Sequence, residues 1–366
     1  MTETSFPVSP QSYPCGGCGA RVEFAPGTTA LRCPYCGFQQ QIEAVDRQVR
    51  EHPIAELATL PRKPVGTLAT HELVCRQCGA RTQSNELSGR CQFCSAPLVV
   101  DPAAVGQILP EAVLPFTLDH NGLRGALRGW VSSRWFAPSA LKKISEAEST
   151  KSTYLPHWTY DSSTTTQYAG ARGEYYYVTE SYTDSSGNRQ TRRVRHTRWH
   201  RAHGTVGRFF DDVLVPATGY VPVERLDDLA PWPLADAVAY QPQYLAGHYT
   251  LRYDVEPEAG LDEAKRRMAP VIREDCRRDI GGDEQRVERV DTHYADITFK
   301  LMLLPVWAAF YVYGGKRFQV FVNGRTGEVH GERPYSAVKI ALAIIAAVLI
   351  IAAIVTLVVM TKHQHA

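Results

Sequence analysis

The residues most able to do chemistry in this chain are its cysteines, because eight of the nine fall into four Cys-x-x-Cys pairs. Two pairs separated by 12 or 14 residues can place four thiolates around one ion in a tetrahedral shell. The sequence therefore predicts two Zn²⁺ sites. Their ligands are Cys15, Cys18, Cys33 and Cys36 at the first site, and Cys75, Cys78, Cys91 and Cys94 at the second.

Zinc is favoured over three other interpretations of these pairs. Four disulfides would need an oxidising compartment, and catalytic Cys-x-x-Cys pairs normally occur singly. The Cys33-Pro-Tyr-Cys36-Gly37 segment resembles the knuckle of rubredoxin, which holds iron, but rubredoxin separates its two pairs more widely. Because thiolates fill all four positions, no place remains for a substrate water, and we expect the zinc to be structural.

The charge of the cysteine-rich region bears on what it binds. Residues 1–110 hold nine Lys/Arg and nine Asp/Glu, and each Cys₄–Zn²⁺ site adds about two negative charges. A net acidic module repels a phosphate backbone. We therefore interpret the two zinc ribbons as protein-docking modules, with nucleic-acid binding as the weaker alternative.

A second group of residues with possible chemistry is a run of arginines between positions 189 and 201. Segments 174–183 and 189–204 read as a long β-hairpin, in which alternate side chains share a face. One reading is a patch for anionic lipid headgroups or nucleic acid; the other is a solvated strand whose arginines pair with Glu174, Glu180 and Asp184. The residues proposed for the binding face are Arg193, Arg195, Trp199 and Arg201.

The elements around these sites predict an α+β fold. Segments 114–172 and 251–331 each read as a strand, a polar turn, an amphipathic helix and two further strands. Tyr154-Leu-Pro-His-Trp-Thr-Tyr160 in the first matches Leu303-Leu-Pro-Val-Trp-Ala-Ala309 in the second. We expect a duplicated domain with an antiparallel sheet, helices on one face of it, and residues 173–204 inserted as a hairpin. Residues 95–113 read as a linker.

These readings divide the chain into four parts, and we expect each zinc ribbon to bury a core separate from the α+β domain. The parts are a first zinc ribbon at 1–50, a second at 66–103, the duplicated α+β domain at 114–335 and a transmembrane helix at 338–361.

The last part is a membrane signal. Residues 340–360 are 21 consecutive residues without a charge, which as a helix span about 30 Å, the thickness of a bilayer core. The first residues show no basic and apolar pattern of a secretory signal. Arg325, Arg333 and Lys339 precede the span, and the cysteine usage suits a reducing compartment. We expect a tail-anchored, single-pass protein of the inner membrane with its body in the cytoplasm.

Composition and motifs argue against catalysis. The 366 residues carry a net charge of only +2, so a chain-wide nucleic-acid footprint is not expected. The sequence contains no G-x-x-x-x-G-K-[ST], H-E-x-x-H or G-x-S-x-G motif. His157 and Asp161 have no nucleophile placed beside them by sequence. We expect no enzyme.

The ordered features resemble a bacterial group of membrane-anchored double zinc-ribbon proteins. The resemblance rests on Cys15–Cys36, Cys75–Cys94, Leu303-Leu-Pro-Val-Trp307 and the helix at 340–360. Such proteins are encoded beside stress systems of the PspA and SPFH (flotillin-like) type, and relatives are described as TFIIB-type zinc-ribbon or primosomal protein N′ helicase-like proteins. A helicase role conflicts with the missing nucleotide-binding loop. The resemblance implies a membrane platform that recruits a cytoplasmic stress protein.

Overall fold

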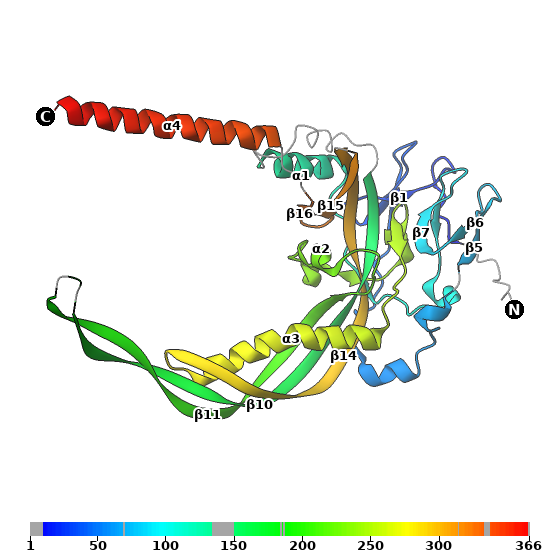
Figure 1. Ribbon diagram of the computed structural model, residues 1–366. Helices are drawn as coiled ribbons and strands as arrows, with labels where there is room; N and C mark the ends of the chain where they lie inside the picture. Colours follow the sequence, from blue (N-terminus) through cyan, green and yellow to red (C-terminus); the bar gives the residue numbers. More distant parts are fainter. Residues whose placement is uncertain are drawn as a thin grey trace.

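Three long antiparallel strands form the frame of the molecule in the computed structural model (Figure 1). It describes residues 10–68, 70–133, 150–183, 185, 187–313, 315–332 and 337–364. The frame strands are β10 (Thr150–Thr183), β11 (Arg189–Pro216) and β14 (Glu284–Tyr313), with β10 in the middle. β15 (Lys316–Asn323) and β16 (Val329–Gly331) continue the sheet beyond β14.

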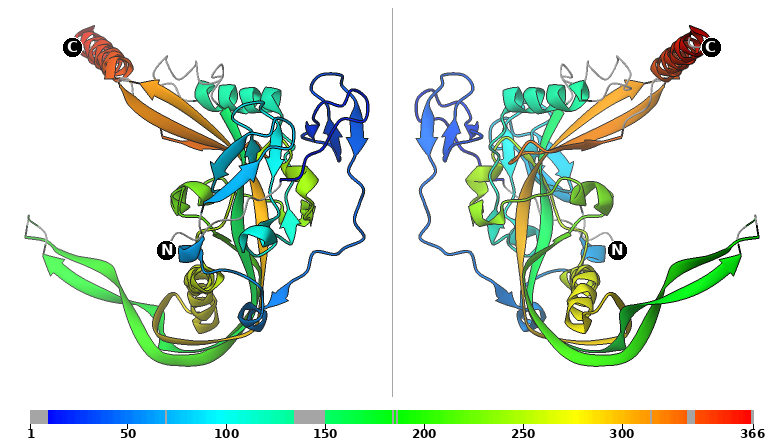
Figure 2. Two further views of the ribbon diagram at one scale, coloured as in Figure 1. Left: turned by 90° about the vertical axis from the view of Figure 1, so that its right-hand side faces the viewer. Right: turned by 90° about the vertical axis from the view of Figure 1, so that its left-hand side faces the viewer.

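The frame strands bend, so that the sheet curves around one of its helices (Figure 2). The β10–β11 register shifts between Tyr160 and Ser162, and Asp212 opposite has a φ of 51°. Such bulges increase local twist and bend a strand. The sequence suggests an inserted hairpin at 173–204, but residues 173–183 and 189–204 are the far ends of β10 and β11. The β10–β11 register continues without a further shift from the Ser162–Phe210 pair to the Thr183–Arg189 pair at the tip.

Two amphipathic helices cover parts of this sheet. α1 (His120–Ser132) begins where the Asp119 carboxylate accepts a hydrogen bond of 2.8 Å from the amide of Gly122. It lies over β15 and β16. α3 (Pro257–Ile280) begins with a proline and packs inside the curve of β10, β11 and β14. Its buried side chains recur every four residues: Ala264, Met268, Ile272, Cys276 and Ile280.

The expectation of a sheet with helices on one face only is wrong at the β15 end. Residues 221–232, which include α2 (Val223–Asp227), cover the opposite face. After them come η5 (Leu234–Asp236) and η6 (Pro242–Leu245), and η6 packs in the same apolar cluster as α1. Phe321, on the face opposite Val320 and Val322, is 2% exposed and packs with Leu226 and Leu229. Both faces are therefore apolar here, and the strand does not alternate between apolar and polar residues.

The cysteine-rich region divides between small sheets and the large one. β1 (Glu23–Phe24), β2 (Ala30–Arg32) and β3 (Gln39–Gln41) form a three-stranded sheet, and β5 (His71–Val74) pairs with β6 (Arg81–Ser84). β7 (Glu86–Arg90) and β8 (Pro97–Val99) join the large sheet through β13 (Tyr249–Leu251). The remaining short elements are β4 (His52–Pro53), η1 (Ile54–Ala58), η2 (Val65–Thr67), η3 (Pro102–Val105), β9 (Ala112–Val113) and β12 (Val238–Ala239).

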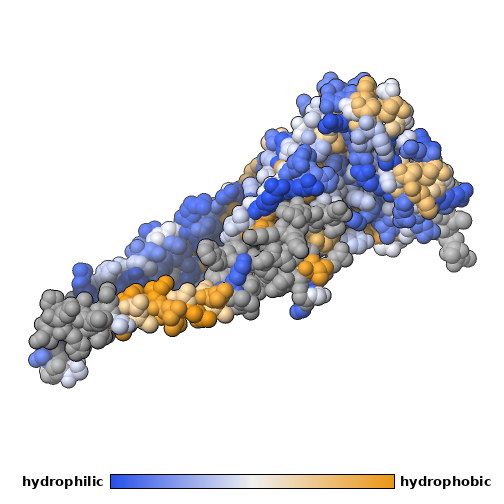
Figure 3. Space-filling view, turned by 90° about the horizontal axis from the view of Figure 1, so that it is seen from above, coloured by the Kyte–Doolittle hydropathy of each residue, from blue (hydrophilic) through white to orange (hydrophobic). Residues whose placement is uncertain are grey.

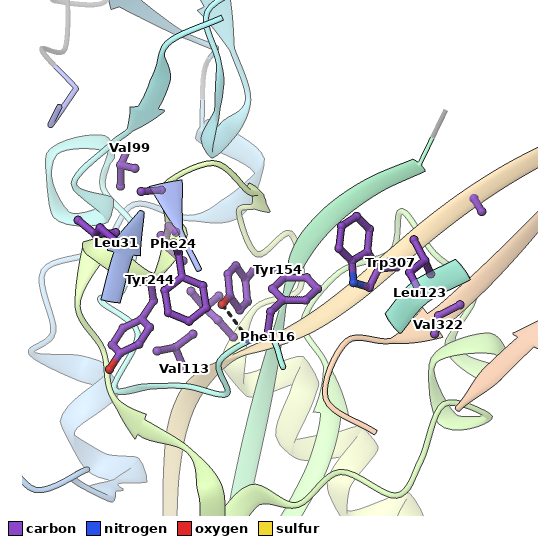
Figure 4. Packing of buried hydrophobic residues seen from close by; sticks show 14 of the residues in the cluster. Phe24, Leu31, Val99, Val113, Phe116, Leu123, Tyr154, Tyr244, Trp307 and Val322 are labelled. Atoms are coloured by element: carbon purple, nitrogen blue, oxygen red, sulfur yellow. Dashed lines mark hydrogen bonds between the residues drawn. The ribbon is translucent and has the colours of Figure 1, made fainter. Parts of the chain in front are cut away.

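Two expectations are corrected by this arrangement. Residues 95–113 are no linker, because β8 and β9 lie within the large sheet. Nor does the first ribbon bury a separate core: Phe24 and Leu31 belong to one apolar cluster with Phe116, Tyr154 and Trp307 (Figure 4). A segment too small to bury its own core uses the sheet as the other half of one.

The last helix, α4 (Ala337–Gln364), stands away from the body (Figure 1). Its segment Lys339–Thr356 has a mean hydropathy of 2.7, and none of that segment is buried. At 1.5 Å per residue, the 28 residues of α4 extend for about 42 Å. Its length and composition are compatible with a membrane anchor.

Candidate metal centres and arginine strand

The first four predicted cysteines lie together at the ends of β1 and β2. The Cys15 and Cys36 sulfurs are 3.6 Å apart, those of Cys18 and Cys33 are 3.7 Å apart, and all four lie within 4.8 Å of one another. A tetrahedron with Zn–S bonds of 2.3 Å has sulfur–sulfur edges of about 3.8 Å. The group therefore has the size of a Cys₄ metal site.

The second four repeat this geometry beside β5 and β7. Cys75 and Cys94 have sulfurs 3.6 Å apart, those of Cys78 and Cys91 are 3.7 Å apart, and the four again lie within 4.8 Å. At both sites the first cysteine of each pair is buried, while the second is more exposed. Both groups could hold a metal ion.

Each pair is shaped by a tight turn that ends in a left-handed residue. The amide after the second cysteine donates to the carbonyl of the first, over 2.8 to 3.0 Å. The φ angles of Gly19, Gly37 and Gly79 are 71°, 75° and 72°, in the left-handed region that glycine adopts without a Cβ clash. Ser95 takes this place in the fourth turn with a φ of 56°, so a serine adopts the conformation that glycine favours.

The electrostatics of each group favour a cation. At the first site, the backbone amide of Cys36 lowers the pKa of Cys33 to about 7. At the second site, burial raises the pKa of Cys94 to about 12. One thiolate forms readily, and its neighbours then resist ionisation because like charges would lie side by side. A divalent ion removes that conflict and allows all four sulfurs to ionise.

Arg21 links the two candidate metal centres by hydrogen bonds. Its guanidinium donates to the Cys94 carbonyl in the second ribbon and, over 2.8 Å, to the Tyr35 hydroxyl in the first. Tyr35 and Phe93, each the residue before the last cysteine of its site, are 66% and 71% exposed. Sequence reasoning missed these aromatics, although their equivalent positions in the two ribbons were a usable signal.

The predicted arginine strand is the outer part of β11, paired with β10. Arg193, Arg195 and Arg201 are exposed and Trp199 is half-buried. The four alternate along one face, opposite Thr179, Tyr177, Ala171 and Gly173. The geometry therefore places the predicted residues together, as the alternation of a strand requires.

The pairing with glutamates occurs on the other face. There Glu180 accepts from Arg192 over 3.3 Å and lies 3.7 Å from His196, while Glu174 contacts Arg172 at 3.2 Å. On the predicted face, Arg195 stacks on the Tyr175 ring at 4.2 Å and Arg193 on Tyr177 at 5.0 Å. The predicted partner Asp184 lies outside the described residues. The solvated-strand reading thus describes one face and not the other.

Comparison with known proteins gives one informative match. The chain is 25% identical over 332 residues to the uncharacterized protein YdjG of Bacillus subtilis (strain 168), which covers 90% of this chain and 92% of that protein. No family model matches the chain. No solved structure matches it either. The similar protein shares the length of this chain, and its name states no activity.

Proposed function

We propose that this protein is a non-catalytic membrane adaptor: α4 holds it in the bilayer, and the two metal ribbons with the α+β domain recruit a partner protein. The observation that carries the proposal is that α4 and the two ribbons lie on opposite sides of the body. The apolar helix leaves one side of the body, and the ribbons lie on the other (Figure 1). Tyr35 and Phe93 are exposed on those ribbons, where aromatic side chains favour protein contacts.

The metal in both sites is zinc, in this proposal, and its role is to hold the recruiting surface in shape. Four sulfur ligands match the preference of zinc, and a filled shell leaves no position for a substrate. Thiolate ligands suit a reducing compartment, so the body lies in the cytoplasm and α4 crosses the inner membrane as a single-pass tail anchor.

The resemblance to double zinc-ribbon proteins indicates the class of partner. A PspA-like or SPFH-type protein of the membrane-stress response is the expected partner. The runner-up function is a membrane-tethered nucleic-acid binder that uses the ribbons and the arginine strand; the stacked arginines on β11 support it. Net acidity in residues 1–110 opposes it.

We also propose that the body arose by duplication, with units β9-α1-β10-β11 and β13-α3-β14-β15. Trp158 Nε1 donates to the Val255 carbonyl over 3.0 Å, and Trp307 Nε1 donates to the Leu118 carbonyl over 3.1 Å. Each carbonyl lies just before a helix, and each tryptophan lies in a Leu-Pro-x-Trp motif. The strand pairing is also equivalent in the two units. β13 forms a parallel pair with Thr153–Tyr154 of β10, and β9 forms a parallel pair with residues 302–303 of β14.

The adaptor proposal is tested by capture of partners from membranes. Tagged full-length protein, extracted in mild detergent, should co-purify with a specific cytoplasmic protein, identified by mass spectrometry. Replacing Tyr35 and Phe93 together by Ala should remove that protein, whereas Tyr220→Ala, with 63% of the side chain exposed in the segment before α2, should not. Capture that persists in the double variant would contradict recruitment by the ribbons.

A further inference from the structure

The long strands have two faces with different surroundings. At the base of β11, Ala202 and Val206 pack in the core beneath α3, and Arg208 pairs with Asp275 of α3 at 2.5 and 2.7 Å. Even-numbered side chains of β11 from residue 190 to Phe210, before the bulge, therefore point into the curve. Odd-numbered ones point outward, and Phe209 among them is 62% exposed. We name these the inner face and the outer face.

The outer face continues across the neighbouring strands. Arg286 and Arg289 of β14 lie opposite Ala171 and Ala169 of β10, on the same side as the odd-numbered residues of β11. Arg286 stacks on the Trp199 ring at 3.8 Å, which joins β14 to β11 across the small side chains between them. The outer face thus extends the predicted arginine strand by a second row of arginines.

The charges on the two faces are unequal. Arginines on the inner face lie beside Glu174, Glu180 and Asp275. On the outer face, no carboxylate pairs with Arg193, Arg195, Arg201 or Arg286 among the residues that the structure describes. Glu284 hydrogen-bonds Tyr175, and Asp291 lies 3.9 Å from Arg289. The outer face is therefore a basic surface with an excess of arginine over acid.

The form of this basic surface selects its ligand. A guanidinium that lies over an aromatic ring still has N–H groups free to bind phosphate oxygens. Single-stranded nucleic acids instead need bare aromatic faces on which bases stack. Here Arg195, Arg193 and Arg286 lie over the rings of Tyr175, Tyr177 and Trp199, respectively, where a base would otherwise stack. Phosphate without a base is the better fit.

We use the term arm for the far ends of β10 and β11 together with the adjoining start of β14. The far ends of β10 and β11 and helix α4 project toward the same side of the body, and the arm surface beside the apolar helix is hydrophilic (Figure 3). With α4 as the proposed anchor, the arm extends toward the membrane side of the body.

We propose that the outer face of the β10–β11–β14 arm binds the phosphate headgroups of anionic lipids in the membrane that α4 anchors. This inference rests on the proposed anchor. A tether raises the effective concentration of lipid at the arm, so contacts that are weak one by one suffice. Each arginine near an anionic surface contributes roughly a fivefold effect, equivalent to about 1 kcal/mol.

Hydrogen–deuterium exchange of the full-length protein in lipid nanodiscs tests this proposal. The amides of residues 174–198 should exchange at least about tenfold more slowly in discs that contain phosphatidylglycerol than in phosphatidylcholine discs. The difference should vanish in about 1 M salt, where screening acts over roughly 3 Å. Inorganic phosphate added to neutral discs at matched ionic strength should not reproduce the protection.

Two matched triple variants locate the contact. Arg193→Gln, Arg195→Gln and Arg286→Gln should abolish the lipid-dependent protection, and Lys at the same positions should restore most of it. The inner-face control Arg172→Gln, Arg192→Gln and Arg198→Gln removes the same charge and should retain it. Unchanged exchange in α3 would show that each variant is folded.

Several results would overturn the assignment. Equal loss in both triple variants, or equal exchange in neutral and anionic discs, would show that the outer face has no lipid role. Greater protection by a single-stranded oligonucleotide in neutral discs would assign the face to nucleic acid. Failure of the protein to enter discs would instead refute the anchor, a separate result from loss of partner capture by the ribbons.

Discussion

The two cysteine groups have nearly the same spacing, yet they are joined to the body by different interactions. The first ribbon contributes side chains to the main core: Cys15, Val22 and Phe24 pack in one cluster with Phe116 and Tyr154. The second ribbon joins mainly through backbone hydrogen bonds, because its strand β7 pairs with β13 in the large sheet, and it adds Val99 of β8 to the main cluster. Its cysteines pack in a small cluster of their own with Leu73, Leu98 and others.

This difference teaches that equal metal sites need not contribute equally to the fold. A side-chain interface transmits disorder into the core it shares, whereas strand pairing can persist when the far end of a hairpin opens. We therefore expect damage to the first site to spread through the body and damage to the second to stay near β5 and β6.

The largest expected effect is loss of one metal. Cys33→Ser and Cys91→Ser remove matched buried ligands, and the metal-linked folding energy at such sites is roughly 10 kcal/mol. Cys33→Ser should speed hydrogen exchange around Tyr154, while Cys91→Ser should affect β5 and β6 alone. Metal analysis should show about two zinc ions per chain in the parent and one in each variant. Equal spread of damage, or mostly iron, would contradict the prediction.

A smaller effect is expected when one apolar side chain is shortened in each ribbon. Phe24 and Leu73 are both 4% exposed. Phe24→Ala should lower the global free energy of unfolding by about 3–5 kcal/mol, because a core cavity loses packing on both sides. Leu73→Ala should leave global unfolding nearly unchanged and increase exchange of β5 and β6. Denaturant unfolding in mild detergent, followed by tryptophan fluorescence, measures the first quantity.

Acid should weaken the interface between the first ribbon and the main core by a moderate amount. His248 stacks on Phe116 at 4.5 Å, and burial lowers the pKa of His248 to about 3. The unfolded chain, with an ordinary histidine pKa near 6.5, binds a proton that the folded chain excludes, so stability is lost as pH falls below about 6.5. The loss at pH 5 is about 2 kcal/mol.

Substitution of that histidine tests the assignment. His248→Phe should remove most of the pH dependence measured between pH 7 and 5 at constant zinc content. His71 in the second ribbon, whose pKa burial also lowers, should matter less because its Nε2 hydrogen-bonds the Glu86 carbonyl in the fold. If His71→Phe removed more of the pH dependence than His248→Phe does, the ranking of the two ribbons would be reversed.

The smallest expected effect concerns the contact between the ribbons. Arg21→Gln removes the guanidinium that joins Cys94 and Tyr35 and should destabilise the pair by about 1–2 kcal/mol. Zinc should then pass faster to a chelator, with the overall fold unchanged. Arg76→Gln, an exposed arginine of the second ribbon, serves as a control. Identical zinc release by both variants would show that the Arg21 contact has no energetic role.

Local patterns predicted a good part of this protein. The turns at the four cysteine pairs and the alternation that puts Arg193, Arg195 and Arg201 on one face depend on a few neighbouring residues. The same is true of the turn at Asn323, whose side chain accepts from the amides of Arg325 and Thr326. Gly314-Gly315 is a residue pair typical of a hairpin turn, and although Gly314 lies outside the described residues, Tyr313 pairs with Lys316 as such a turn requires.

Long-range arrangement was not readable in the same way. Nothing in the spacing of residues 173–204 distinguishes an inserted hairpin from the ends of strands that begin at Thr150, because β periodicity is the same in both. Phe321 alternates with Val320 and Val322 along β15, and only the packing of residues 221–232, far away in sequence, buries it.

By itself, the sequence determined the cysteine grouping, the apolar span of α4 and the two faces of the arginine strand, because each depends on residues close together in the chain. Tertiary structure alone decided that the first ribbon shares the main core, that the second extends the large sheet, and that Arg286 joins the outer face. Those contacts join residues far apart in sequence, and only the packing of a whole sheet determines which of them meet.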